Sequence, residues 1–222
     1  RLVVLGGGPI GCELAQSFAR LGSHVTQVEM GARIMVREDA DVSELAKAAL
    51  EADGVQVLTG HKALRCEMVD GEKILVVEHA GAEQRIVFEQ LLCAVGRSPR
   101  VTGYGLEELG LPLTPRGTLQ TNDRLQTRFP NIYAVGDVAG GAQFTHVAGA
   151  HAGVVIRQVL FGLRAKAATV VPWVTYTDPE LAQLGLTEAQ AHARLRKLAM
   201  DQNKRIGEVA QDLLTYAKAL KF

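Results

Sequence analysis

A glycine-rich turn near the start of the chain constrains its fold more than any other feature. Residues 2–5 form a short, continuously apolar run, which is typical of a parallel strand covered on both faces. This run leads directly into residues 6–11, Gly-Gly-Gly-Pro-Ile-Gly, and residues 12–21 then repeat apolar side chains at helical spacing. Strand, glycine turn and helix therefore follow one another in the order that begins a doubly wound α/β fold.

The three spaced glycines of this turn have separate physical roles. Gly6 permits the tight turn, Gly8 lets the backbone approach a pyrophosphate, and Gly11 lets the helix pack closely against the strand. The phosphates would contact free N–H groups at the helix N-terminus, where Pro9 and Ile10 stand. The motif predicts a dinucleotide site, and the alternative is a glycine turn that binds no nucleotide.

An acidic residue ends the next predicted strand, residues 24–29. Glu29 lies 21 residues beyond Gly8, which is the spacing of a carboxylate that accepts hydrogen bonds from the adenosine ribose. Because such a carboxylate would repel a 2′-phosphate, it favours NAD(H) over NADP(H). Arg33 and Arg37 follow closely enough to reach a phosphate. The alternative for Glu29 is a solvated strand end.

The rest of the first hundred residues is consistent with this fold class. A second helix is expected to open at Asp41, with Glu44 as a capping partner, and a third strand is expected at residues 55–58. The apolar period changes to two over residues 61–88, which predicts a small antiparallel meander. A buried strand at residues 91–95 then closes the unit. We therefore predict an α/β chain with a Rossmann-like, doubly wound domain that carries the meander.

Patterns in the second half of the chain are less regular. Residues 98–126 are loop-like and contain several prolines and glycines. A strand is expected at residues 131–137 and a helix at residues 147–163. A further strand is expected at residues 173–176, and no partner strand is predicted after it, so this last unit is expected to be incomplete.

Two polar residues of the second half are candidates for a binding site. Asp137 ends the predicted strand, and an acid there commonly binds a polyol or a metal. His146 lies near the next helix start, where negative charge is favoured. No metal ligation is predicted, since His146 and His151 are five residues apart rather than four. The alternatives are a capping role for Asp137 and a surface role for His146.

The charge balance and the apolar runs exclude several function classes. The 24 basic and 24 acidic residues give a formal net charge of zero, so no overall field attracts nucleic acid or an anionic membrane. The apolar runs are shorter than the roughly 18 residues that a membrane span needs. We expect neither a nucleic-acid partner nor a membrane, and no secretory signal. The abrupt start on a strand favours a piece of a longer protein.

The cysteines carry no recognisable framework. Cys12, Cys66 and Cys93 are the three cysteines, and their spacing fits neither a disulfide framework nor a zinc site. A cytoplasmic protein is therefore expected. Cys12 is interpreted as a helix-packing residue, and on physical grounds alone Glu13 beside it is structural.

Several segments resemble, in the same order, the class I pyridine nucleotide-disulfide oxidoreductases. These flavoproteins include dihydrolipoamide dehydrogenase, mercuric reductase and glutathione reductase. The segments that carry the resemblance are residues 6–15, 94–99, 127–138, 144–148 and 176–188. The resemblance covers residues 1–191 and implies that a hydride passes from NAD(P)H to FAD and on to a disulfide or metal-ion substrate. It also implies a homodimer.

The resemblance implies three domains and assigns roles to single residues. Residues 1–97 would be the NAD(P)-binding domain, residues 98–168 the central part of the FAD domain, and residues 169–222 part of an α+β dimerisation domain. Beyond the glycine turn and Glu29, the implied cofactor contacts are Gly96, Gly136, Asp137, Thr145 and His146.

Asp137 would bind the ribityl chain of the flavin, and Thr145-His146 would face its pyrimidine edge. Glu13 matches a carboxylate near the junction of nicotinamide and flavin and is the candidate catalytic residue. Pro9 stands where some members have a gating tyrosine, so no aromatic gate is expected.

The chain also departs from the family pattern. The amino-terminal flavin half with its CxxxxC pair and the carboxy-terminal histidine-glutamate pair are not in this sequence. Beyond residue 191 the resemblance ends, and residues are expected to be missing near 195–205. Our leading hypothesis is a fragment of an FAD-dependent oxidoreductase that retains NAD(H) binding. The alternative is a stand-alone dinucleotide-binding or interaction module without redox activity.

Overall fold

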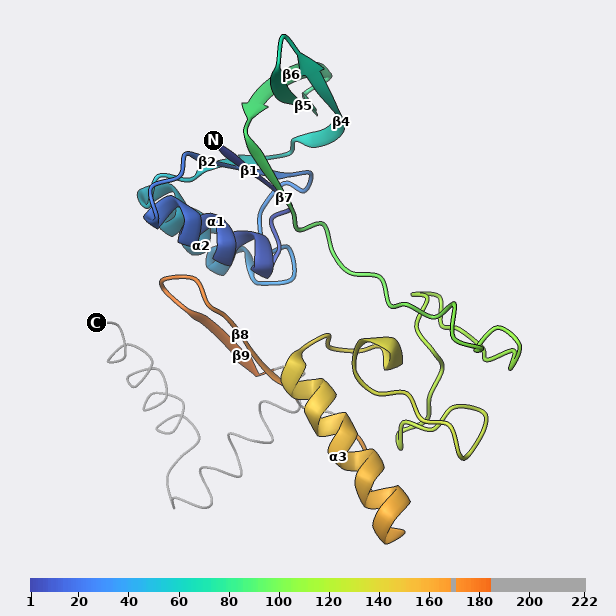
Figure 1. Ribbon diagram of the computed structural model, residues 1–222. Helices are drawn as coiled ribbons and strands as arrows, with labels where there is room; N and C mark the ends of the chain where they lie inside the picture. Colours follow the sequence, from blue (N-terminus) through green and yellow to red (C-terminus); the bar gives the residue numbers. More distant parts are fainter. Residues whose placement is uncertain (169–170, 185–222) are drawn as a thin grey trace, which may run out of the picture. The chain divides into compact units, whose positions relative to one another are not determined.

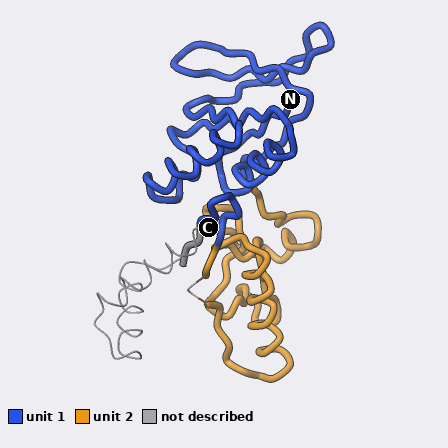
Figure 2. Tube along the Cα trace, turned by 90° about the vertical axis from the view of Figure 1, so that its left-hand side faces the viewer, with its two compact units in different colours: residues 1–96, 174–182 blue, residues 97–173, 183–222 orange. Residues whose placement is uncertain are grey.

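The computed structural model describes residues 1–168 and 171–184. The chain divides into two compact units (Figure 2). The first unit comprises residues 1–96 and 174–182, and the second comprises the other described residues.

A parallel sheet of four strands forms the centre of the first unit (Figure 1). In spatial order the strands are β3 (Gln56–Thr59), β2 (Val25–Glu29), β1 (Leu2–Leu5) and β7 (Gln90–Cys93). The crossovers are helices α1 (Pro9–Arg20) and α2 (Ala40–Ala52). The predicted α/β class with a Rossmann-like parallel sheet is confirmed.

Neighbouring residues of β1 enter two different cores. Val4 packs with Cys12 and Leu50 on the helix side of the sheet. Val3 packs with Leu75 and Val77 of the meander on the opposite side. Because both faces are covered, β1 is apolar throughout, as a buried parallel strand requires.

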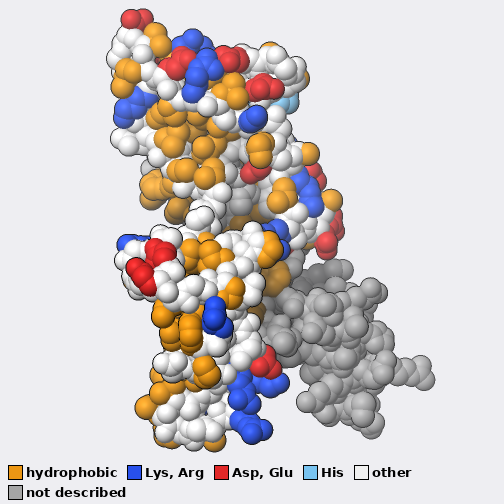
Figure 3. Space-filling view, turned by 90° about the vertical axis from the view of Figure 1, so that its right-hand side faces the viewer, with side chains coloured by type: hydrophobic (Ala, Val, Ile, Leu, Met, Phe, Trp, Pro, Cys, Tyr) orange, Lys and Arg blue, Asp and Glu red, His pale blue; other side chains and the backbone are white. Residues whose placement is uncertain are grey.

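The predicted antiparallel meander is confirmed. It consists of β4 (Lys62–Val69), β5 (Glu72–His79) and β6 (Ala82–Phe88), with β5 in the middle. Leu75 faces the core. On the opposite face Arg65 pairs with Glu67 and Glu83, and Arg85 pairs with Glu67. Figure 3 shows basic and acidic side chains intermixed over the meander.

The start of α2 differs from the prediction. Asp39 is the N-cap residue, so the helix begins before Asp41, and no side chain caps it. Asp41 instead accepts the N–H of Val42 at 3.0 Å. The hydroxyl of Ser43 donates to the carbonyl of Ile34 at 2.7 Å, and this buried contact fixes the first turn of the helix.

The second unit is mostly irregular chain. Its regular elements include a short helical turn and a longer helix, η1 (Gly136–Ala139) and α3 (Thr145–Phe161). The strand predicted at residues 131–137 is wrong. Val135 has extended angles (φ −130°, ψ 147°), but only Tyr133 has a bridge partner, Gln126, so no ladder forms among the described residues. Within the described part of the chain, no helix is long and apolar enough to cross a membrane.

The strand predicted near residue 173 does have a partner. β8 (Pro172–Thr175) pairs with β9 (Leu181–Leu184) in a two-stranded sheet, so the expected unpaired strand is wrong. β9 has only four residues and little alternation, which is why its pattern gave no signal. The predicted departure beyond residue 191 and the missing stretch near 195–205 lie outside the described residues.

Candidate functional site

Packing explains two of the three spaced glycines, and open space surrounds the third. Gly6 has φ +113°, and a Cβ there would lie 2.5 Å from the carbonyl oxygen of Ala94. A Cβ on Gly11 would lie 2.2 Å from the carbonyl oxygen of Gly6. A Cβ on Gly8 would meet nothing within 4 Å. The turn therefore needs Gly6 and Gly11 for its shape, and Gly8 leaves its outer side open to a ligand.

The N-terminus of α1 is exposed beside this open side. Gly8 is the N-cap and provides no side-chain cap, and both Pro9 and Ile10 are exposed. The first N–H groups of a helix have no partner within the helix, so this end is suited to an anion. Gly96 follows the neighbouring strand β7 and is also exposed, with φ +119°.

The carboxylate of Glu29 is bound to the glycine turn. One of its oxygens accepts the N–H of Gly7 at 2.6 Å, and the other accepts the N–H of Gly31 at 2.6 Å. A Cβ on Gly7 would lie 2.9 Å from the Cγ of Glu29. Glu29 is thus held at the turn rather than solvated at a strand end. The sequence pattern gave no indication of the contact with Gly7.

The two arginines after β2 have different surroundings. The guanidinium of Arg33 donates to the carbonyl of Glu38 at 2.6 Å and to that of Val36 at 3.2 Å. Arg37 is exposed. Arg33 therefore ties together the loop that follows β2.

Side chains on α1 bind the turn between β8 and β9. A carboxylate oxygen of Glu13 accepts the N–H of Tyr176 at 2.8 Å. The amide of Gln16 pairs with the backbone of Asp178, donating to its carbonyl at 2.9 Å and accepting its N–H at 2.8 Å. Arg20 donates to the Asp178 carboxylate at 2.9 Å. This docking was not predicted, and it fixes one oxygen of Glu13.

Cys12 lies under the glycine turn with its side chain buried. Burial raises the pKa of the Cys12 thiol to about 11, so it stays protonated near neutral pH. Its sulfur lies 3.4 Å from the side-chain nitrogen of Gln27. These surroundings agree with a packing role.

In the second unit, the backbone around Asp137 is held by a buried histidine. The N–H of Gly136 donates to Nδ1 of His151 at 3.2 Å. Burial lowers the pKa of His151, which favours the neutral ring that can accept this bond. Asp137 is half-exposed and pairs with Arg97 at 3.4 Å. The sequence pattern gave His151 no such role.

Thr145 and His146 begin α3 and are exposed. Nε2 of His146 donates to the carbonyl of Pro172 at 2.8 Å. The imidazole stacks on Phe144 with ring centroids 5.3 Å apart, and Phe144 in turn lies 6.4 Å from Trp173. The N-terminus of α3 is thus accessible, and no side chain caps it.

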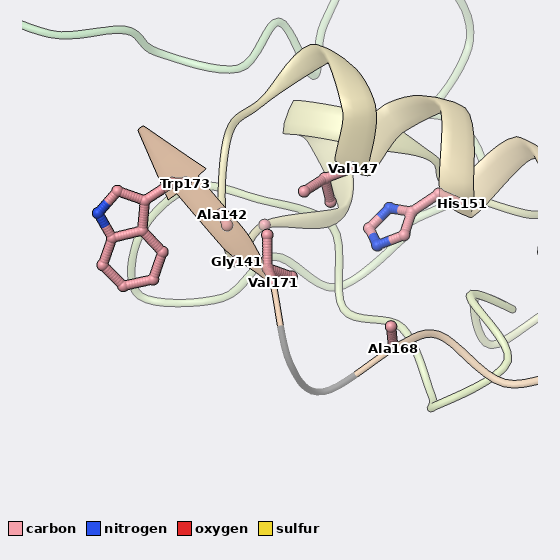
Figure 4. Close-up of a pocket in the computed structure, with 8 residues that line it drawn as sticks. Gly141, Ala142, Val147, His151, Ala168, Val171 and Trp173 are labelled. Carbon is pink, nitrogen blue, oxygen red and sulfur yellow. The ribbon is translucent and has the colours of Figure 1, made fainter. Parts of the chain in front are cut away.

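A cavity of about 310 Å³ lies beside the first turns of α3. Figure 4 shows Val147 and His151, one turn apart, on the same side of α3 as Val171 and Ala142. None of the predicted flavin contacts lines this cavity. Among residues 1–168 and 171–184, no cluster of three or more His, Cys, Asp or Glu side chains could hold a metal ion.

Comparison with protein families gives two matches. A model described as pyridine nucleotide-disulphide oxidoreductase matches residues 1–152. A model of the ANTAR domain matches residues 181–214, most of which lie outside the described residues.

Individual proteins also match. Dihydrolipoyl dehydrogenase of Thermus scotoductus is 42 % identical over 193 residues, which cover 86 % of this chain and 42 % of that protein. Mercuric reductase of Bacillus cereus is 40 % identical over 192 residues, which cover 86 % of this chain and 30 % of the reductase. The structure of the HOCl-induced flavoprotein disulfide reductase RclA from Escherichia coli matches with a TM-score of 0.76 and 32 % identity, covering 86 % and 43 % of the two chains. The chain thus spans less than half the length of these proteins.

Proposed function

Because the chain belongs to the pyridine nucleotide-disulphide oxidoreductase family, we propose that its first unit binds NAD(H) at the glycine turn. The observation that carries this proposal is the open side of Gly8 next to the uncapped N-terminus of α1. The N–H groups of that helix end would donate to the pyrophosphate, and Gly8 would let it approach the backbone. Gly96, which follows the neighbouring strand β7, would contact the cofactor at the same edge of the sheet.

The carboxylate of Glu29 supports NAD(H) over NADP(H). It is held at the turn by the N–H of Gly7, and an ionised carboxylate accepts hydrogen bonds from ribose hydroxyls and repels a phosphate. Arg33, which could otherwise neutralise a 2′-phosphate, donates to two backbone carbonyls of its own loop.

We propose that the second unit contributes to an FAD site in the complete protein. When both are bound, NADH supplies a hydride and FAD accepts it. Asp137 is half-exposed and would accept hydrogen bonds from the hydroxyls of the ribityl chain. Thr145 and His146, at the uncapped start of α3, would face the polar edge of the flavin.

Glu13 is our candidate for the carboxylate between the nicotinamide and flavin sites. The N–H of Tyr176 holds one of its oxygens at 2.8 Å. The domain limits 1–97, 98–168 and 169–222, reduction of a disulfide or metal ion, and homodimer formation belong to the same proposal for the complete protein.

Calorimetric titration of the chain with NADH and with NADPH tests the NAD(H) proposal. We expect one NADH per chain, weaker binding of NADPH, and shifts in the amide resonances of Gly7, Gly8 and Gly11 in a parallel NMR titration. Unmoved amides at saturating NADH would contradict the assigned site, and tighter binding of NADPH would contradict the role given to Glu29. A flavin absorbance band in the purified chain would show that this chain binds a flavin without further segments.

A further inference from the structure

We propose that Gln27 is a positioning residue of the dinucleotide site. Together with Glu29 it fixes the orientation of the Gly6–Gly7 peptide. This inference rests on the NAD(H) site proposed above and concerns how the chain shapes that site.

Two side chains of β2 hold the two ends of one peptide plane. Nε2 of Gln27 donates to the carbonyl of Gly6 at 3.1 Å. Glu29 accepts the N–H of Gly7, the other end of the same peptide, at 2.6 Å. Because Gln27 and Glu29 are two residues apart on a strand, their side chains project from the same face. A rotation of the Gly6–Gly7 peptide would break both bonds.

The bond from Gln27 matters because of where the carbonyls of the turn point. The carbonyl of Gly7 accepts the N–H of Met35 at 2.7 Å, and that of Gly8 accepts the N–H of Cys12 at 3.0 Å. The carbonyl of Gly6 accepts a side-chain donor, Gln27. A carbonyl oxygen turned outward would present negative charge to a pyrophosphate. All three carbonyls are instead bound within the protein, and the groups left for a pyrophosphate are the N–H groups at the start of α1.

Gln27 occupies a buried position where an apolar side chain would destabilise the folded state less. Gln27 is fully buried, and its Oε1 has no hydrogen-bond partner among the described residues. A buried amide oxygen without a partner destabilises the folded state. The amide therefore has a cost in stability, and its N–H groups provide the bond that orients Gly6. The absence of a side chain on Gly11 leaves the space for it, since a Cβ there would lie 3.3 Å from Nε2 of Gln27.

The variant Gln27→Met tests this role, because methionine keeps the length of the side chain and removes the donor. We expect the Kd for NADH to rise about fivefold, as for the loss of one hydrogen bond. We expect the unfolding temperature to change little, since the variant removes the unpartnered oxygen but also leaves the Gly6 carbonyl without its donor. An unchanged Kd in the folded variant would overturn the proposal.

Val25→Ala is the matched control, since Val25 is buried on the same strand as Gln27 and its side chain makes no hydrogen bond to the turn. It should lower the unfolding temperature and leave the Kd for NADH within twofold of the parent chain. A Kd that rises as much as in Gln27→Met would assign the effect to packing and overturn the proposal.

A measurement on the unaltered chain covers the case in which the variant does not fold. Without NADH, the Gly7 amide should already exchange slowly with solvent, because Glu29 holds it. Fast exchange at Gly7 would show that the peptide is not fixed and would overturn the inference. Failure of the parent chain to bind NADH would instead contradict the proposed function itself.

Discussion

At the scale of single residues, we propose two tasks for the carboxylate of Glu29. Its contact with Gly7 orders the turn, whichever dinucleotide is present. Its remaining lone pairs are available to a ribose that carries hydroxyls and no phosphate. The two tasks can be separated because the first affects both cofactors and the second affects only one.

The replacement Glu29→Ala should weaken the binding of NADH about tenfold or more and weaken the binding of NADPH less. The loss common to both cofactors measures the ordering of the turn, and the difference between them measures the ribose contact. Calorimetry gives both affinities. Asp39→Ala is the control, because this exposed acid does not cap α2 and should change neither affinity. Equal losses for NADH and NADPH would leave Glu29 with the ordering role alone.

We expect His151 to make the second unit sensitive to acid. Its pKa is lowered by burial from the ordinary value of 6.5. Between 6.5 and the lower value, the unfolded chain binds more protons than the folded one, so stability falls as the pH falls through this window. Protonation of Nδ1 also breaks the bond from Gly136.

We therefore expect the midpoint of thermal unfolding, followed through Trp173 fluorescence, to decrease from about pH 8 to about pH 5. His151→Gln should flatten this dependence because glutamine does not titrate. His24→Gln, at an exposed histidine, should leave the slope unchanged. The same slope in His151→Gln as in the parent chain would exclude His151 as the cause.

The sequence predicted those parts of the candidate site whose residue type and spacing are specific to a dinucleotide site. The glycines of the turn and Glu29 fall at positions with a specific spacing, and the structure places them together. Gln27 gave no signal, because one polar residue within a strand usually indicates an exposed position. The bond between Glu13 and Tyr176 spans 163 residues, so no local pattern could reveal it.

At the scale of elements, α1 connects two parts of the first unit. Its N-terminus adjoins the glycine turn, and its side chains at positions 13, 16 and 20 bind residues 176 and 178. Gln16 contacts the backbone of Asp178 twice, so it holds this segment much as a neighbouring strand would. The Arg20 guanidinium also holds the pKa of Asp53 below its ordinary value.

Gln16→Leu should release the segment that contains Tyr176 and Asp178. Leucine is similar in size to glutamine and, being apolar, is suited to this buried position. We expect the amides of Tyr176 and Asp178 to exchange with solvent at least about tenfold faster, since the loss of bonds to Asp178 loosens its neighbour as well. Hydrogen exchange followed by NMR gives both rates. Ser17→Ala is the control, because Ser17 is exposed and its hydroxyl donates only within α1. Unchanged rates would show that Gln16 does not hold the segment.

Helices and strands with a clear apolar period were predicted from the sequence. Segments whose strand character depends on pairing with another segment were not. β1, α1, β2 and the meander follow from period and turn residues. Residues 131–137 have a strand-like composition, but the described residues supply only one bridge there, and a strand exists only with a partner. β9 shows the opposite case, since its pairing with β8 makes a strand of four residues that lack a clear pattern.

At the scale of the whole molecule, the chain contains one glycine turn of the dinucleotide type. It spans less than half the length of the relatives that it matches. The first unit has a four-stranded parallel sheet with both faces covered. The second unit has one long helix and mostly irregular chain among its described residues. Among the proposed activities, dinucleotide binding is therefore the one for which the described residues supply the most groups.

The outer face of the meander affects how molecules of this protein meet one another. Arg65, Glu67, Glu83 and Arg85 form ion pairs over the middle strand β5, and all lie away from the core. A second sheet stacked on this face would have to strip water from four charges whose mutual attraction is already satisfied. Face-to-face stacking of a second sheet on this charged surface is thus unfavourable.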